Sequence, residues 1–289
     1  MRILTAAAAT LILLLLPAAA SAMACFKAAG RQSVPGGKRC TEPNSTMVES
    51  WLLTTQTGGR AEAADVWFEA PMDAGGLSAA TQAALAHAFL PEGQRLQALL
   101  SPAGRKRLAA AAQTLEVPVE RLDRLQPWYA ELMIQSGLFE KLGVSGSDGV
   151  EEQLWAGLSP TAKRATLETP EQQIGFFADA PIKEQVASLE QTLKDVPHAE
   201  RDYQELLKAW LGADIRTLDR QVVAPLKKSS PGLYDRVVTQ RNARWIKAID
   251  RRLGGSGETV IVVGMGHLIG PDGLPAQLRA QGYAVEGPR

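Results

Sequence analysis

Short apolar runs lie near both ends of the globular part of the chain, and a long stretch with helical spacing separates them. The strongest run, residues 260–263, consists only of Val and Ile, as expected of a strand buried on both faces. Weaker patterns predict further strands at residues 64–70, 164–168 and 282–285. Strands that enclose a helical middle indicate an α/β fold with a small central sheet.

Apolar residues recur three and four positions apart through most of the middle of the chain, which is the spacing of helices with one buried face. Ser101 before Pro102 fits an N-cap followed by a first-turn proline, and Asp148 fits a second N-cap. Helices are predicted at residues 78–88, 92–99, 101–115, 118–125, 126–142, 146–154, 169–173, 182–249 and 274–280. We therefore expect one α/β domain over residues 61–289 with a helical insertion at about 78–250.

The first residues have the order of a secretory signal peptide. Arg2 precedes an apolar run over residues 3–16, and small residues follow at 18–22. The apolar run is too short to be a permanent membrane anchor, and no later segment is a candidate for a span. We therefore expect cleavage after residue 22 and a periplasmic or secreted mature protein. A lipid anchor on Cys25 is the less favoured alternative.

Residues 23–60 differ from the rest, because Pro, Gly and charged residues are scattered there without a run of four apolar residues. This segment is predicted to be mostly loop. Cys25 and Cys40 are the only cysteines; an oxidising compartment would allow them to pair, and without neighbouring histidines they do not make a zinc site. The whole chain has 31 basic and 31 acidic residues, which argues against a nucleic-acid partner.

Three polar residues each follow an apolar run and precede a turn: Glu69, Glu168 and His267. We expect them to converge at one edge of the sheet, with Gly264 and Gly266 leaving room around His267. Two carboxylates and an imidazole suit a divalent metal or general acid–base chemistry. For Glu168, capping of the next helix is an equally good interpretation.

Arg241 and Asn242 lie in the last long helix before the terminal strand, upstream of Trp245. Arg241 is able to hold a carboxylate with two hydrogen bonds, and Asn242 offers both a donor and an acceptor. From the sequence of the helix alone we favour a solvated Arg241 on the face opposite Trp245. His87 and His198 are expected at the surface. The glycines near the C-terminus do not fit the dinucleotide fingerprint, so no nucleotide cofactor is expected.

Several of these pieces also form a recognisable series. The most specific are residues 263–274, which contain Gly264, Gly266 and His267, and the Arg241-Asn242 pair with Trp245 downstream of it. Supporting pieces are residues 64–69, 146–150, 167–172, 209–214 and 233–234. In this order they resemble the TraB/GumN family, which is related to the TIKI metalloproteases and more remotely to the haem-binding ChaN proteins.

The resemblance implies two related α/β halves and a site built from two Gly-x-x-His motifs, one in each half, with an acidic residue. His267 matches the second motif, Glu69 matches the acidic residue, and Arg241 and Asn242 match the helix that faces the site. In the TIKI branch such a site binds manganese or cobalt and cleaves peptide bonds. The resemblance thus implies a metal-dependent hydrolase that acts on a peptide or a small molecule.

The chain departs from this pattern in the first half, because no histidine precedes Glu69. Either the first motif has been lost, or a reading-frame error affects residues 25–59. Glu69 and His267 alone are too few ligands for a catalytic metal, so Glu168 or Asp148 would have to contribute. The competing hypothesis is a non-catalytic protein that binds a haem-like or other ligand, or serves in protein interactions.

Overall fold

The computed structural model describes residues 25–29, 52–57, 65–144 and 150–287 of the 289-residue chain. The predicted signal peptide (1–22), most of the segment 23–60, the second cysteine, Cys40, and the predicted cap Asp148 lie outside the described residues. The signal peptide, the pairing of the cysteines and the role of Asp148 therefore stay predictions.

The described strands form one mixed sheet in the order β4-β3-β5-β2-β1-β6. Its members are β1 (Cys25–Ala29), β2 (Leu52–Thr57), β3 (Asp65–Phe68), β4 (Lys163–Thr166), β5 (Gly257–Val262) and β6 (Ala284–Glu286). Strands β4, β3 and β5 are parallel, and β2 runs antiparallel to β5. Phe68 is level with both Thr166 and Val262, so these three parallel strands end side by side.

Strands β1 and β2 lie in the segment 23–60, for which the sequence predicted mostly loop and no strand; the remainder of that segment lies outside the described residues. Strand β2 lies inside the sheet, parallel to β1 and antiparallel to β5 along its whole length. Its sequence has two leucines followed by three threonines among four residues, and Thr favours strands although it adds no apolar alternation. A rule based on apolar runs therefore misses this strand.

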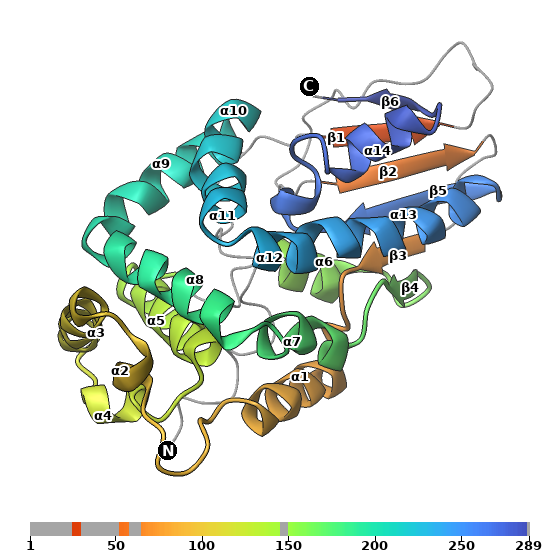
Figure 1. Ribbon diagram of the computed structural model, residues 1–289. Helices are drawn as coiled ribbons and strands as arrows, with labels where there is room; N and C mark the ends of the chain where they lie inside the picture. Colours follow the sequence, from red (N-terminus) through yellow and green to blue (C-terminus); the bar gives the residue numbers. More distant parts are fainter. Residues whose placement is uncertain (1–24, 30–51, 58–64, 145–149, 288–289) are drawn as a thin grey trace.

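Helices fill the middle of the chain, and those near the C-terminus lie over one face of the sheet (Figure 1). They are α1 (Ala74–Ala86), α2 (Leu96–Leu99), α3 (Pro102–Thr114), α4 (Val119–Leu122), α5 (Pro127–Lys141), α6 (Val150–Gly157), α7 (Pro170–Ala178), α8 (Ile182–Asp195), α9 (Ala199–Leu211), α10 (Ile215–Leu218), α11 (Ala224–Ser229), α12 (Pro231–Tyr234), α13 (Gln240–Leu253) and α14 (Leu274–Ala280). Shorter turns are the 3-10 helices η2 (Val196–His198) and η5 (Met265–His267) and the π-helices η3 (Asp219–Val223) and η4 (Asp235–Thr239). The fold is α/β with a helical insertion, as predicted.

The alternation of side chains in the parallel strands explains how helices attach to both faces. Ile261 packs with Trp245 and other residues of α13 on one face. Phe68 and Val262 point to the other face, where Phe68 contacts Trp155 of α6 edge to face at 5.0 Å between ring centroids. The ends of the parallel strands are therefore enclosed between α13 and α6.

Side-chain caps begin several of these helices. Ser101 accepts a hydrogen bond from the backbone N–H of Gly104, as predicted. Thr169 forms a capping box with Gln172 at the start of α7. Glu168 is not a cap, so that interpretation of Glu168 was wrong. The side chain of Thr169, one residue later, caps α7 instead.

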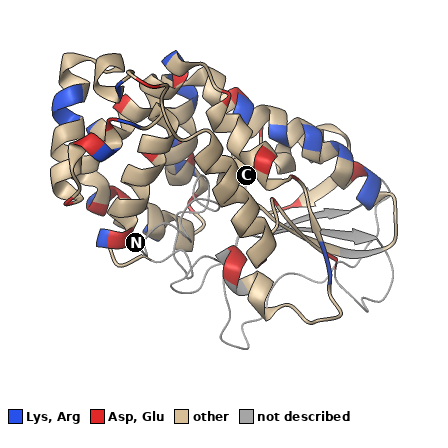
Figure 2. Ribbon diagram, turned by 90° about the horizontal axis from the view of Figure 1, so that it is seen from below, with Lys and Arg blue, Asp and Glu red and all other residues tan. Residues whose placement is uncertain are grey.

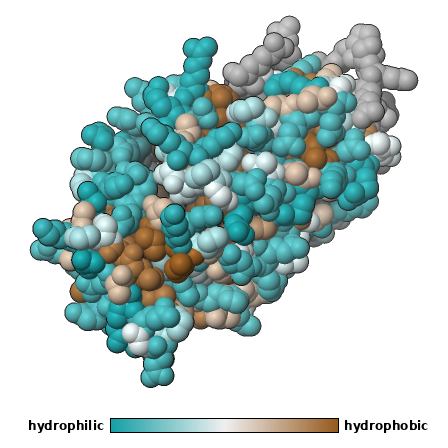
Figure 3. Space-filling view, viewed as in Figure 1, coloured by the Kyte–Doolittle hydropathy of each residue, from teal (hydrophilic) through white to brown (hydrophobic). Residues whose placement is uncertain are grey.

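A second apolar core lies within the helical middle, away from the sheet. Leu96, Leu108, Ile134 and Leu189 are among its fully buried members. The opposite charges are interspersed over the surface (Figure 2), and the face in Figure 3 is mostly hydrophilic apart from an apolar patch over the helical middle. No helix in the described ranges combines the length and apolar composition that a bilayer span requires.

Leu189→Ala should lower the free energy of unfolding by about 2–5 kcal/mol, because it leaves a cavity in the core of the helical middle. Leu189 is fully buried, whereas Leu85 is 40% exposed, so Leu85→Ala is the matched control and should change stability by less than about 1 kcal/mol. Denaturant titrations of the mature protein measure both. Equal effects of the two variants would contradict this assignment of the core.

Candidate functional site

The ends of the three parallel strands bring the predicted polar residues together. Glu69 directly follows β3, Glu168 lies two residues after β4, and the chain beyond β5 turns into η5, which ends at His267. The N–H of Glu168 donates to the backbone carbonyl of Glu69 at 2.8 Å. The expected convergence of these residues at one edge of the sheet is therefore present in the structure.

Arg241 joins the three side chains. Its Nε and Nη2 donate to Glu168 Oε2 at 3.0 and 2.8 Å, its Nη2 also donates to Glu69 Oε2 at 2.5 Å, and its Nη1 lies 3.1 Å from His267 Nε2. The arginine is 2% exposed. Its buried positive charge is balanced by two carboxylates and hydrogen-bonded on every side.

The expectation of a solvated Arg241 was wrong. Residues 241 and 245 are four positions apart, so they share one side of a helix. Trp245 Nε1 donates to Glu168 at 3.0 Å, and the Arg241 guanidinium lies 4.7 Å from the Trp245 ring centroid and 5.2 Å from that of Phe176. The side chains form one unit, and Phe176 is a member that the sequence analysis did not identify.

Glu69 has further partners besides Arg241. Its Oε1 accepts from the backbone N–H of Gly264 at 2.7 Å, and its Oε2 accepts from Gln173 Nε2 at 3.3 Å. Gly264 has φ −56°, a value open to any residue, so its clear contribution is this N–H. Gln173, on α7, is a second site residue that the sequence analysis missed, because its side chain carries no charge and stands in an ordinary helix start.

His267 is neutral and has one defined tautomer. Arg241 can only donate, so Nε2 must accept and the proton lies on Nδ1, which donates to Asn242 Oδ1 at 2.7 Å. Asn242 Nδ2 in turn donates to the backbone carbonyls of His267 and Asp272. Burial, and then the charge of Arg241, lower the pKa of His267 well below its usual value. Asn242 therefore fixes the ring, while Arg241 occupies its lone pair.

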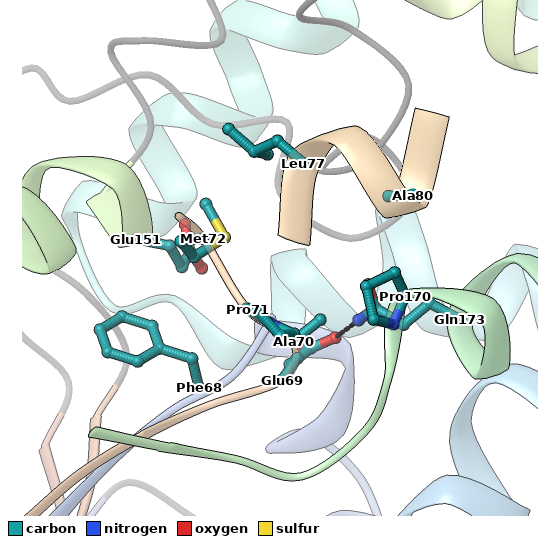
Figure 4. A pocket seen from close by; sticks show the side chains of 10 residues that line it. All are labelled: Phe68, Glu69, Ala70, Pro71, Met72, Leu77, Ala80, Glu151, Pro170 and Gln173. Atoms are coloured by element: carbon teal, nitrogen blue, oxygen red, sulfur yellow. Dashed lines mark hydrogen bonds between the residues drawn. The ribbon is translucent and has the colours of Figure 1, made fainter. Parts of the chain in front are cut away.

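Glu69 and its partner Gln173 border a cavity (Figure 4). The cavity, of about 20 Å³, also touches Glu151, Phe68 and Met72. Burial raises the pKa of the partly buried Glu151 to about 7, and the nearby charge of Glu69 adds to this. The space has room for about one water molecule or a group of that size.

The residues of this edge do not fit the metal centre that the resemblance implies. Glu69 Oε1 and His267 Nε2 lie 3.8 Å apart, but they are two donors, and a catalytic metal usually has three protein ligands. Within the described ranges, no three His, Cys, Asp or Glu side chains gather as a metal site. The guanidinium of Arg241 also places a positive charge against both donors.

One comparison with known proteins finds a match. The model of the TraB/PrgY/gumN family matches residues 53–287, which is most of the chain. The chain belongs to the TraB/PrgY/gumN family. The match extends through the strand ends, the helical middle and α13, so it covers Glu69, Glu168, Arg241 and His267. No curated protein and no solved structure matches the chain.

The two remaining histidines lie away from this network, and Gly266 lies beside it. His87 and His198 are exposed, as expected. Gly266 is buried within η5, next to His267. The roles assigned to Glu69, His267, Arg241 and Asn242 as catalytic or metal-binding residues stay predictions, whereas their mutual contacts are established by the structure.

Arg241→Met should lower the free energy of unfolding by about 3–5 kcal/mol at neutral pH, because it leaves two buried carboxylates without their cation. Arg244→Met is the control: Arg244 is 48% exposed and contacts Glu168 only at 3.4 Å, so its loss should cost below about 1 kcal/mol. Denaturant titrations measure both variants; similar losses would contradict the central role of Arg241.

The lowered pKa of His267 predicts the sign of its pH effect. The unfolded chain binds a proton at this residue below about pH 6.5, and the folded protein does not. The contribution of His267 to the free energy of unfolding is therefore highest above that pH, and it decreases as the pH falls and the unfolded chain takes up the proton. Nitrogen NMR should show a neutral ring protonated at Nδ1, and His267→Gln should lack this part of the pH dependence. A ring that gains its proton at or above pH 6.5 in the folded protein would refute the assignment.

Proposed function

We propose that this TraB/PrgY/gumN protein is a non-catalytic ligand-binding protein rather than a metal-dependent hydrolase. The observation that supports it is the position of Arg241, which already provides the cation for Glu69 and Glu168 and occupies the lone pair of His267. A general base needs a free lone pair, and a metal ligand needs one too. In this arrangement the lone pair of the imidazole is occupied by Arg241, so His267 can serve in neither role.

The ligand would reach the network at the cavity beside Glu69. Glu69 and Glu151 contribute carboxylate oxygens there, Gln173 contributes an amide, and Phe68 and Met72 contribute apolar walls. These groups favour a single N–H-donating head group, such as the terminal ammonium of a peptide or a small molecule whose stem stays outside the cavity. A cavity of about 20 Å³ is too small for a haem-like ligand.

A metal-dependent hydrolase, of which a peptidase is one form, is the second candidate. The observation in its favour is the 3.8 Å separation of Glu69 Oε1 and His267 Nε2, which would allow one manganese or cobalt ion to contact both atoms after Arg241 moved away. Membership of the wider TIKI and ChaN group, suggested by the sequence, belongs to this proposal. The missing first histidine speaks against it.

Export belongs to the proposal as well. Its support is the order of charge, apolar run and small residues over positions 2–22. A periplasmic or secreted location would give the site access to peptides and small molecules outside the cytoplasm.

Metal and cleavage assays on the purified mature protein separate the two candidates. We expect no stoichiometric manganese or cobalt by calorimetry and no cleavage in a peptide library with either ion added, because Arg241 holds the site closed. Cleavage that is lost in His267→Ala but kept in the surface control His198→Ala would establish the hydrolase. Glu151→Gln should weaken binding of short alkylamines about tenfold if the cavity takes an amine.

A further inference from the structure

A much larger cavity lies in the helical middle, separate from the Glu69 network. Its lining residues come from α5, α8, η2, α9, η3 and α11, and its volume is about 500 Å³. This volume is in the range of small-molecule pockets in proteins, about 300–1,000 Å³. None of its lining residues belongs to the network around Arg241.

The walls of this cavity are largely apolar. Leu138, Phe139 and Leu142 of α5 line one side, and Tyr203 and Leu206 of α9 line another. Phe139 and Tyr203 contact each other edge to face, with 5.6 Å between ring centroids. The cavity therefore offers an aliphatic or aromatic body a surface that water wets poorly.

One polar atom at this cavity lacks a partner. Gln221 lies in the π-helical turn η3, and its Nε2 donates to Glu205 at 2.9 Å. Its Oε1 is buried and has no hydrogen-bond partner among the described residues. A buried carbonyl oxygen without a donor is unfavourable, and π-helical turns often occur where proteins bind ligands. The missing partner is a hydrogen-bond donor.

The charges around the cavity indicate what kind of donor. Asp195 and Asp202 contribute carboxylates, and no Lys, Arg or His is among the described residues that line it. Asp195 accepts from the neutral Gln191, and the Arg201–Asp202 pair is solvent-exposed, where an ion pair contributes little. The lining therefore favours a positively charged head group.

We propose that this cavity binds an amphiphile with a primary ammonium head and an aliphatic body. The body packs against Leu138, Phe139 and Leu206, the head lies beside Gln221 and becomes the partner of its Oε1 when that side chain turns toward the cavity, and Asp195 and Asp202 supply the negative potential. This binding site is distinct from the small amine site beside Glu69 and does not depend on it.

Calorimetry of the mature protein with n-decylamine, n-decanol and decanoate tests the head group. All three have the same aliphatic body, and they are used below their aggregation concentrations. Decylamine should bind about tenfold or more tightly than decanol, and decanoate should not bind measurably. Equal affinities of decylamine and decanol would overturn the proposal.

Variants locate the binding site. Methyl NMR shifts of Leu138 and Leu142, which line this cavity, report decylamine bound here rather than at the Glu69 pocket. Leu206→Trp fills the cavity and should abolish these shifts, and Gln221→Leu should weaken the binding they report about tenfold. Glu151→Gln, in the other pocket, and the surface control Gln82→Leu should leave them unchanged, so failure of one proposal is distinguishable from failure of the other. Decylamine-induced shifts of Leu138 and Leu142 that survive Leu206→Trp refute the site. If a cavity variant does not fold, methyl NMR of the wild type replaces it: shifts on decylamine addition must include Leu138 and Leu206.

Discussion

The buried guanidinium of Arg241 is the interaction on which the rest of this site depends. It is surrounded by Glu69, Glu168 and the imidazole of His267, and removing an arginine from water is tolerable only when every donor finds an acceptor. Each partner is in turn held by another group, such as the Gly264 N–H on Glu69. Loss of one member leaves a buried charge or lone pair unmatched, so the strand ends and α13 are fixed together.

The backbone arrangement of the parallel strands brings the partners of Arg241 close together. The level register of β4, β3 and β5 puts Glu69 and Glu168 side by side. The π-helical turn η4 precedes α13 directly, and Arg241 Nη1 also lies 3.3 Å from the carbonyl of Val237 inside that turn. Such π-helical turns are frequent at functional sites, and here the turn lies directly before Arg241 and Asn242.

How much the sequence could predict depends on the range of the interactions involved. Local patterns were sufficient for α14, whose bounds agree residue for residue, for the cap Ser101 and for the three strand ends. Strand β2 was not predicted because its sequence has no long apolar run; it is a strand because it pairs with β5 along its whole length. The prediction for Arg241 used only the sequence of its own helix, whereas its partners Glu168 and Glu69 lie 73 and 172 residues away in the chain. Only the four-residue step to Trp245 indicated its buried side.

Charge decides between an arginine and a divalent metal at this edge. With Arg241 in place, Glu69, Glu168 and a neutral His267 leave a small net negative charge that the protein has already distributed over close hydrogen bonds. A divalent ion there would be repelled by the guanidinium, since the two positive charges would lie within a few ångströms of each other in a buried site of low dielectric. A guanidinium is satisfied by the planar acceptors that this edge offers, whereas a metal needs a third protein ligand. With a single histidine at the sheet edge, the arginine is the better partner for these carboxylates, and this balance of charge favours binding without metal chemistry.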